Sequence, residues 1–269
     1  MAKRDGTVAD IELGVGALPA AELERLGHDR RAGVRAVARR ELRRRAEAAA
    51  EAERLERMLV HERRLWERGV ALIAGVDEVG CGPLAGPVVA AAVILPAGCS
   101  IADINDSKQL DAATRERLVP EIQARAVAFA LGSCTVEEID RLNIYRAALE
   151  AMRRAVTTLS VTPAHLLVDA RRVPGVVMSQ TSIIDGDALS QSIAAASVLA
   201  KVHRDGLMRE LALAHPGSGF DNHKGYATAE HLAALEKLGP CPAHRRSFAP
   251  VRQGDLFAGV KSAGSEADG

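Results

Sequence analysis

After residue 70 the chain alternates short apolar runs, bounded by Gly and Pro, with longer stretches in which apolar residues recur every three or four positions. Runs of Val, Ile and Ala predict buried strands at residues 70–76 and 88–95. Pro87 and Pro96 enclose the second run, whose Ala content would allow a helix but whose length and Val and Ile ends favour a strand. Further strands are expected at residues 126–131, 165–169 and 181–184, and helices at 112–123, 144–159, 189–212 and 228–237. This order of elements predicts an α/β fold.

The first 70 residues have a different pattern. Residues 34–68 contain neither Gly nor Pro and are dominated by the helix formers Ala, Arg, Glu and Leu. One apolar stripe has a spacing of three or four: Val34, Ala38, Leu42, Ala46, Ala49, Ala52, Leu55 and Leu59. We therefore expect one long helix or a helical hairpin. The predicted organisation is a helical N-terminal extension at residues 1–70, an α/β domain at 71–250 and a flexible tail at 251–269.

Charge also divides the chain near residue 70, because the first quarter of the chain carries nearly half of its basic residues. Residues 1–70 carry 16 Lys and Arg against 13 Asp and Glu, while the whole chain balances 35 against 35. The arginines of the N-terminal helix could contact phosphates, but Glu is interleaved with them throughout, which favours a solvated helical face. Net charge alone therefore gives no argument for a nucleic-acid partner.

Composition is typical of a globular protein with reduced thiols. Apolar residues make up 48% of the 269 positions, enough for a sizeable core, and the four cysteines form no CxxC pair. The N-terminus lacks the apolar segment of a signal peptide. The uncharged run at residues 79–102 contains three prolines, which a membrane-spanning helix would not accommodate. We expect a cytoplasmic protein.

Two adjacent acids, Asp77 and Glu78, follow the first strand and precede a glycine-rich segment. Adjacent carboxylates repel each other, and a divalent cation that prefers oxygen ligands would resolve this conflict. The alternative is a surface turn with two solvated acids. Asp169 and Asp187 also end or follow apolar strands. Four carboxylates from separate segments are enough for a site of two Mg²⁺ or Mn²⁺ ions that hydrolyses phosphodiesters.

The glycines do not support a nucleotide-binding loop. The spacing of Gly80, Gly82 and Ala85 fits a dinucleotide-binding fingerprint loosely. However, Pro87 breaks the helix that should follow, and the two preceding acids would repel a pyrophosphate. No Lys-Ser or Lys-Thr pair follows the glycines, which excludes a Walker A loop.

Five segments occur in the same order as the motifs of bacterial ribonuclease HII, and the chain closely resembles that family over residues 71–250. These segments are residues 76–95, Asp106-Ser107-Lys108, residues 193–205, His223-Lys224-Gly225-Tyr226 and His244-Arg245-Arg246-Ser247-Phe248. The helical extension is similar in composition to the N-terminal extension of some bacterial members. Several independent motifs in order make a chance match very improbable.

The resemblance implies an RNase H-like fold, in which helices flank a mixed sheet and a small helical portion follows. It also implies a metal-dependent endoribonuclease with Mn²⁺ or Mg²⁺ as cofactor. Members of the family hydrolyse the RNA strand of RNA–DNA hybrids and nick duplex DNA 5′ to embedded ribonucleotides. The products carry 5′-phosphate and 3′-hydroxyl ends. Family members are usually monomeric.

The family's four metal-binding and catalytic carboxylates correspond to Asp77, Glu78, Asp169 and Asp187. Asp187 is chosen because it lies six positions before Ile193, as in the family motif. Asp185 is the alternative. In the role division that we expect, Asp77 bridges both ions, Glu78 and Asp169 complete one coordination sphere, and Asp187 completes the other.

The resemblance also suggests residues that bind the nucleic acid. The backbone of Gly80, Cys81 and Gly82 is expected to approach the 2′-hydroxyl, and Tyr226 to pack on the sugar at the RNA–DNA junction. Phosphate contacts, or ion pairs with the acids, are expected from Lys108, Lys201 and Arg204. We interpret Ser197 as a core hydroxyl, and His223 and His244 as structural residues.

Two positions depart from the family pattern. Cys81 stands where the family usually has Arg, and Ala170 stands where it has Gly after the third acid. Ala170 can still place Asp169 correctly unless its backbone is left-handed. These departures motivate an alternative, a catalytically weakened protein that binds RNA–DNA hybrids. A nuclease that cleaves only DNA, such as a resolvase, is disfavoured by the ordered motifs.

The tail contains a further short motif. The segment Gln253-Gly254-Asp255-Leu256-Phe257 resembles the peptide with which bacterial repair proteins bind the sliding clamp. The Leu-Phe pair could fill an apolar pocket on such a partner. We therefore expect Gln253, Leu256 and Phe257 to contact the clamp.

Overall fold

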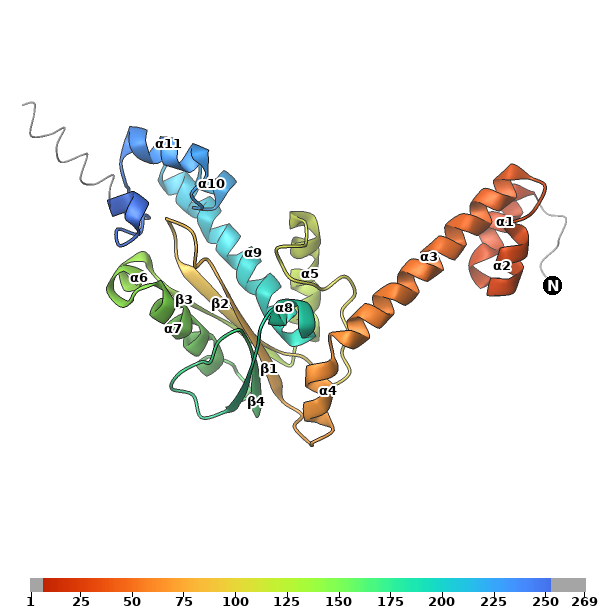
Figure 1. The fold of residues 1–269 in the computed structure, drawn as a ribbon, viewed down its shortest axis with the longest axis horizontal. Helices are drawn as coiled ribbons and strands as arrows, with labels where there is room; N and C mark the ends of the chain where they lie inside the picture. Colours follow the sequence, from red (N-terminus) through yellow and green to blue (C-terminus); the bar gives the residue numbers. More distant parts are fainter. Residues whose placement is uncertain (1–6, 253–269) are drawn as a thin grey trace, which may run out of the picture. The chain divides into compact units, whose positions relative to one another are not determined.

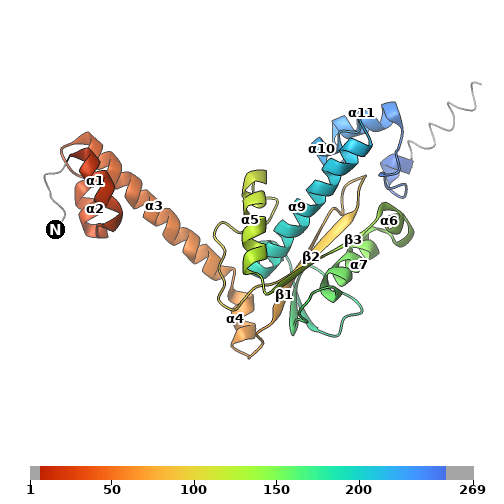
Figure 2. The same cartoon turned by 180° about the vertical axis from the view of Figure 1, so that it is seen from behind.

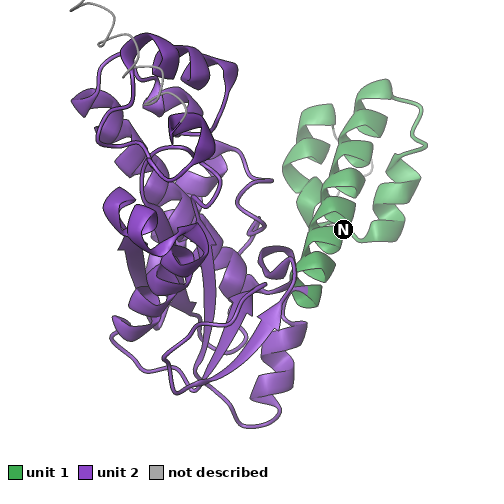
Figure 3. Ribbon diagram, turned by 60° about the vertical axis from the view of Figure 1, so that its left-hand side comes forward, with its two compact units in different colours: residues 1–57 green, residues 58–269 purple. Residues whose placement is uncertain are grey.

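The computed structural model describes residues 7–252, and the chain divides after residue 57 into two compact units (Figure 3). The expected clamp-binding residues Gln253, Leu256 and Phe257 lie outside the described residues. No helix among residues 7–252 is both long and apolar enough to span a membrane. All four cysteines are free thiols in the structure.

The N-terminal unit is helical. It contains α1 (Val8–Gly14), the short 3₁₀ helix η1 (Val15–Ala17), α2 (Ala20–Leu26) and α3 (Ala32–Arg57). Val15, Leu23 and Val37 form its small core. Along α3, exposed arginines pair with exposed glutamates of the same helix, as Arg43 does with Glu47 and Arg57 with Glu53. These ion pairs agree with the interpretation of a solvated face.

The second unit is built on a five-stranded sheet with the order β3-β2-β1-β4-β5. The strands are β1 (Ile73–Val79), β2 (Val88–Ile94), β3 (Ala128–Cys134), β4 (His165–Asp169) and β5 (Ser179–Ile183). β1 pairs antiparallel with β2 and parallel with β4, so the sheet is mixed. The predicted fold class, an RNase H-like mixed sheet flanked by helices, is confirmed.

Helices cover both faces of the sheet (Figure 1; Figure 2). One face carries α7 (Ile144–Thr157), preceded by α6 (Val136–Leu142), and the other carries α9 (Gln191–Ala214) with α5 (Ala112–Arg125) beside it. Glycines allow the closest approaches. A Cβ at Gly75 would lie 2.0 Å from the Ser192 backbone of α9, and one at Gly132 would lie 2.2 Å from the Ala151 carbonyl oxygen of α7.

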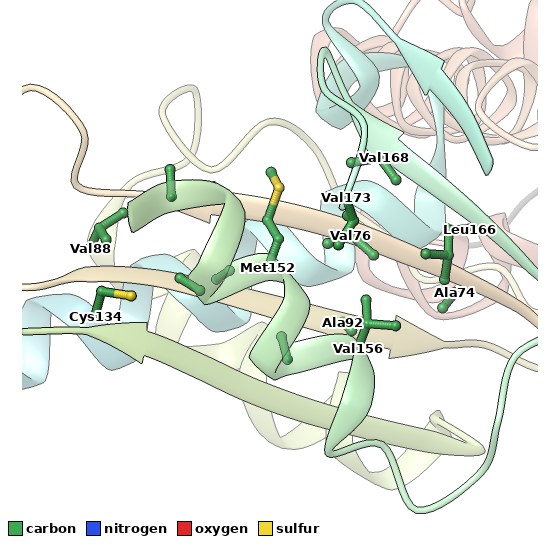
Figure 4. Close-up of a cluster of buried hydrophobic side chains, with 14 of the residues drawn as sticks. Ala74, Val76, Val88, Ala92, Cys134, Met152, Val156, Leu166, Val168 and Val173 are labelled. Carbon is green, nitrogen blue, oxygen red and sulfur yellow. The ribbon is translucent and has the colours of Figure 1, made fainter. Parts of the chain in front are cut away.

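The main core lies between the sheet and α7 (Figure 4). Alternate residues of β1, Ala74 and Val76, point to this side. They pack with Met152 and Val156 of α7 and with Leu166 of β4. The intervening residues of β1 therefore face α9, which places successive side chains at the end of this strand on opposite faces of the sheet.

Short helices complete the unit. α8 (Gly186–Leu189) lies between β5 and α9, and α10 (Phe220–His223) and α11 (Ala229–Leu238) follow α9. In this unit the sequence predicted the strands and long helices to within a few residues. It did not predict α6, α8 or α10, each of which has seven residues or fewer.

The predicted helix at residues 34–68 is interrupted. α3 ends at Arg57 and α4 (Val60–Trp66) begins after Leu59, although no Gly or Pro marks the break. The Met58 carbonyl accepts a hydrogen bond of 3.0 Å from the Gln191 amide at the start of α9. α4 thus belongs to the second compact unit, and the units divide at residue 57, whereas the sequence pattern placed the division at residue 70.

Glu62 of α4 is the main link between this segment and α9. Its side chain is 1% exposed. Its Oε1 accepts hydrogen bonds from the Ser190 hydroxyl at 2.6 Å, the Ser192 hydroxyl at 2.9 Å and the Ser192 amide at 3.1 Å. A carboxylate at a helix N-terminus is stabilised by the unpaired amides and by the helix dipole. Glu62 therefore caps α9 from a distant part of the chain.

We expect Glu62→Ala to lower the free energy of unfolding by about 3 kcal/mol, because three buried donors lose their acceptor. Urea denaturation monitored by circular dichroism measures this change. Glu67→Ala, at an exposed position just after α4, is the control and should change stability by less than about 0.5 kcal/mol. Equal stability of the two variants would show that the cap is unimportant.

Ala170, directly after β4, has a φ of 47°, in the left-handed region that Ala disfavours. The structure thus answers the question that the sequence left open at this position. Asp169 is nevertheless placed at the strand end, because the Ala170 amide donates a 2.8 Å hydrogen bond to the Ile183 carbonyl of β5.

We expect Ala170→Gly to raise the free energy of unfolding by about 0.5 kcal/mol. Relief of left-handed strain outweighs the greater freedom of glycine in the unfolded chain. Ala126→Gly is the matched control, because Ala126 has a φ of −65°, which is unstrained for Ala. Its free energy of unfolding should fall by about 0.5–1 kcal/mol. Destabilisation of both variants to the same extent, measured by urea denaturation, would contradict this account.

Candidate active site

Asp77 and Glu78 lie at the end of the central strand β1, opposite Ala91 and Ala90 of β2. Because side chains alternate along a strand, Asp77 points to the α9 side of the sheet and Glu78 to the α7 side. Asp77 is 4% exposed, and its Oδ1 accepts a hydrogen bond of 2.7 Å from the Glu78 amide. This burial excludes a surface turn with two solvated acids.

Asp169 ends β4, the parallel neighbour of β1, in which Val168 pairs with Val76. Asp77 and Asp169 follow these paired residues, so the two acids lie side by side at the ends of neighbouring strands. Asp169 Oδ1 accepts a hydrogen bond of 2.8 Å from the Gly186 amide at the start of α8, which brings Asp187 to the same strand ends.

The structure distinguishes the two candidates for the fourth acid. Asp187 is 6% exposed and interacts electrostatically with Asp77 and Asp169. Asp185 is exposed, with a left-handed backbone at a φ of 54°. Asp187 is therefore the better candidate.

The four carboxylates destabilise each other's charged forms. Burial raises the pKa of Asp77 well above its ordinary value, and the charges of Glu78, Asp169 and Asp187 raise it further. Burial is also the largest cause of the raised pKa values of Glu78, Asp169 and Asp187. The Ser197 hydroxyl opposes this effect through a hydrogen bond to Asp77. Ser197 is 3% exposed, as a core hydroxyl should be.

Lys108 and Asp106 extend the acidic cluster. Lys108 Nζ lies 3.4 Å from Asp187 Oδ2 and 3.7 Å from Asp106 Oδ1, so Lys108 has the ion-pair role that was one of its two expected roles. Asp106 raises the pKa of Asp187 by its charge and by a side-chain hydrogen bond. Sequence reasoning noted the Asp106-Ser107-Lys108 motif but did not assign Asp106 to the site.

The donor set fits a hard divalent cation. All four acids offer only carboxylate oxygens, and Glu78 Oε2 is buried without a hydrogen-bond partner among the described residues. No three His, Cys, Asp or Glu side chains within residues 7–252 form a preformed metal-ligand set. The fit therefore rests on the chemistry and mutual repulsion of the carboxylates.

The loop after β1 contacts Glu78. Cys81 Sγ lies 3.6 Å from Glu78 Oε1, and burial raises the pKa of this thiol to about 11, which keeps it protonated near neutral pH. Arg171 Nη2 lies 3.1 Å from Glu78 Oε1 and 3.9 Å from Cys81 Sγ. Sequence reasoning missed Arg171, which follows Asp169 by two positions and is the cation nearest to Glu78.

Tyr226 lies beside the same loop. Its side chain is 42% exposed, and a Cβ added to Gly82 would lie 3.7 Å from its Cε1 atom. The Tyr226 carbonyl binds His231 Nδ1 at 2.9 Å, and His231 Nε2 lies 3.1 Å from His244 Nε2. His223 and His244 are 7% and 4% exposed, so both are buried structural residues, as predicted.

The two other predicted phosphate contacts lie elsewhere. Arg204 is fully buried and donates to the carbonyls of Ala85, Pro87 and Lys224, so the prediction that it contacts a phosphate or pairs with an acid of the site is wrong. Lys201 Nζ pairs with Asp205 Oδ1 at 2.8 Å. The periodicity of α9 could not reveal which of its cations points to the protein interior.

Comparison with known proteins identifies the family. The family model described as "Ribonuclease HII" matches residues 74–251 of this chain. The model described as "Ribonuclease HII N-terminal domain" matches residues 13–66. A ribonuclease HII of Anaeromyxobacter sp. (strain Fw109-5) is 56% identical over 90% of this chain and 79% of its own length. A ribonuclease HII of Myxococcus xanthus (strain DK1622) is 55% identical over 88% of this chain and 81% of its own.

Solved structures share the fold. Ribonuclease H2 from Pyrococcus horikoshii OT3 is similar with a TM-score of 0.60 and 23% sequence identity, over 69% of this chain and 98% of that chain. The sequence matches extend over both units, and Asp77, Glu78 and Asp169 lie at adjacent strand ends of a shared fold. The chain therefore belongs to the ribonuclease HII family, whose members are metal-dependent endoribonucleases that act on RNA–DNA hybrids.

Proposed function

We propose that this protein uses two divalent cations to hydrolyse the RNA strand of RNA–DNA hybrids and to nick duplex DNA 5′ to embedded ribonucleotides. Products with 5′-phosphate and 3′-hydroxyl ends are expected. The observation that carries the proposal is the convergence of Asp77, Glu78, Asp169 and Asp187, whose charges raise one another's pKa values. Carboxylate clusters of this kind suit cations that stabilise phosphodiester hydrolysis.

The four carboxylates would hold the cations. When bound, two such ions make water a usable nucleophile near neutral pH and stabilise the departing 3′-oxygen. No nucleophilic side chain is required, and the protonated Cys81 thiol is unsuited to that role. Mg²⁺ and Mn²⁺ both match the donor set. A ribonuclease HIII with the same fold, at a TM-score of 0.53 and 18% identity, has been solved in complex with Mn²⁺.

We assign ribose recognition to the loop beside the acids. Gly82 is exposed and lies against Tyr226, so backbone amides and an aromatic ring face the same region. A 2′-hydroxyl can accept from such amides, while the ring packs on the sugar. Lys108, whose side chain is 76% exposed next to Asp187, is the candidate phosphate contact. Lys201, whose Nζ pairs with Asp205 Oδ1 on α9, is proposed as a second phosphate contact.

Cleavage of three end-labelled duplexes tests the proposed activity: a duplex with one ribonucleotide, an RNA–DNA hybrid and an all-DNA duplex. We expect a nick 5′ to the ribonucleotide and cleavage of the hybrid in Mn²⁺ or Mg²⁺, but not in EDTA. Asp77→Asn should reduce the rate by about 10³-fold or more, because an essential charged ligand is lost.

Asp185→Asn is the matched control for that substitution. Asp185 is exposed and outside the set of four acids, so this variant should cut at nearly the rate of the unsubstituted protein. Cleavage of all-DNA duplexes would indicate a general nuclease. Binding of the hybrid without cleavage in either metal would favour the catalytically silent alternative.

Asp77→Asn should also make the folded protein more stable near neutral pH, on the order of 1 kcal/mol. The pKa of Asp77 is raised by folding, so its ionised form is less stable in the folded than in the unfolded state. Stability should therefore increase as pH falls toward the raised pKa, and this dependence should weaken in the variant.

Thermal unfolding between pH 5 and pH 8 measures this dependence. Mn²⁺ should raise the Tm of the unsubstituted protein more than that of Asp77→Asn, because a ligand that binds the folded state stabilises it. A variant that is less stable than the unsubstituted protein at every pH would contradict the proposed repulsion among the carboxylates.

We also propose that the tail binds a sliding clamp and that the protein is otherwise a monomer. A PCNA:RNase HII complex from Archaeoglobus fulgidus contains a chain of similar fold, at a TM-score of 0.53 and 23% identity. Deletion of residues 253–257 should abolish clamp binding in surface plasmon resonance without changing cleavage. Undiminished binding after the deletion would refute this role of Gln253, Leu256 and Phe257.

A further inference from the structure

Arg245, near the end of the described chain, is fully buried and forms no ion pair within residues 7–252. Its guanidinium instead donates to four carbonyl oxygens of the loop that links β1 to β2. The acceptors are Gly80 at 2.6 Å, Pro83 at 2.7 Å, Gly86 at 2.9 Å and Cys81 at 3.2 Å. A single side chain therefore fixes the orientation of four peptide groups in this loop.

The orientation of a carbonyl determines that of the next amide. The C=O and N–H of a trans peptide point in opposite directions. Because the Gly80 and Cys81 carbonyls point inward to Arg245, the amides of Cys81 and Gly82 point away from it. Neither amide forms a hydrogen bond with any described residue. Gly82 is exposed, so its amide can donate to a bound molecule.

These two amides lie in the region assigned above to ribose recognition. Cys81 contacts Glu78 of the acidic cluster, and Gly82 lies against Tyr226. Successive amides that point to one side of a loop form a concave site for oxygen acceptors. A donor pair held in place before binding also loses little entropy when the ligand arrives.

We infer that Arg245 is a positioning residue for substrate recognition: by holding the Gly80 and Cys81 carbonyls, it directs the Cys81 and Gly82 amides toward the 2′-hydroxyl of the ribonucleotide. This inference rests on the proposed function of the loop. Arg245 itself does not contact the substrate, because its side chain is fully buried.

The chemistry of arginine suits this role. A guanidinium has five N–H donors in one plane, whereas lysine has a single nitrogen that cannot reach four separated carbonyls. The Phe248 ring, whose centroid lies 5.2 Å from the Arg245 Cζ atom, supports the guanidinium. Burial and the nearby Arg204 lower the pKa of Arg245 to about 9, which still leaves it charged near neutral pH. A buried cation is costly, and an apolar residue would fill the space without that cost.

The test measures ribose discrimination rather than activity. In an Asp77→Asn background, which prevents cleavage, fluorescence anisotropy gives the Kd for a duplex with one ribonucleotide and for the same duplex in all-DNA form. Arg245→Lys should reduce the ratio of the two affinities by about tenfold, while affinity for all-DNA duplex changes by less than about twofold. The ratio is independent of the fraction of folded protein, so a purely structural role would not change it.

Arg154→Lys is the matched control. Arg154 also donates to a backbone carbonyl, that of Ser133 at 2.6 Å, and pairs with Glu138, but it belongs to α7 and lies outside the site. We expect it to lower the Tm and to leave the affinity ratio unchanged. An unchanged ratio in Arg245→Lys as well would overturn the inference.

A second pair of variants leaves Arg245 in place. Gly82→Pro removes one of the two amide donors, whereas Gly82→Ala adds a Cβ and keeps the donor. The added Cβ would only contact Tyr226, at 3.7 Å. Gly82→Pro should lose more ribose preference than Gly82→Ala, and equal ratios in this pair would refute the role of the amide. A parent protein without ribose preference would instead refute the proposed function of the loop.

Discussion

The loop between β1 and β2 is held in shape by two buried guanidiniums. Arg245 binds four of its carbonyls, and Arg204 binds those of Ala85 and Pro87 together with that of Lys224. Buried carbonyls need donors, and an irregular loop cannot supply enough of its own. The arginines therefore make a buried non-helical segment possible next to the acids. The same contacts join the segments that carry Cys81, Gly82 and Tyr226 into one surface.

The acidic cluster buries negative charge, whereas the arginines of the loop bury positive charge. Burial and mutual repulsion raise the pKa of Asp77, so its ionised form destabilises the folded state. α7 and α9 pack on the two faces of the central strand, so Asp77 and Glu78 cannot move apart without disturbing the core. Stability and function therefore compete at this strand end. Lys108 and Arg171 offset part of the negative charge from opposite sides of the sheet.

Glu62 connects α4 to the helix that supports the acids and the loop. It caps α9, and α9 carries Ser197, which hydrogen-bonds Asp77, and Arg204, which holds the loop. The start of α9 is also adjacent to α8 and hence to Asp187. The segment that follows α3 is thus part of the scaffold of the site, although its composition resembles that of the extension before it.

The sequence by itself determined the α/β class, the strands and the long helices of the second unit, because these follow from local periodicity, and motifs in order pointed to the four candidate acids. Only the tertiary structure decided the break at Met58 and Leu59, the cap made by Glu62, the burial that supports Asp187 over Asp185 and the interaction of Asp106 with Asp187. The roles of Arg204 and Arg245 belong to this second group. Arg245 lies 165 positions from Gly80, and a hydrogen bond over that separation leaves no trace in local hydrophobic patterns. Periodicity records which face of an element is buried, whereas the partner that satisfies a buried polar group depends on how distant segments pack.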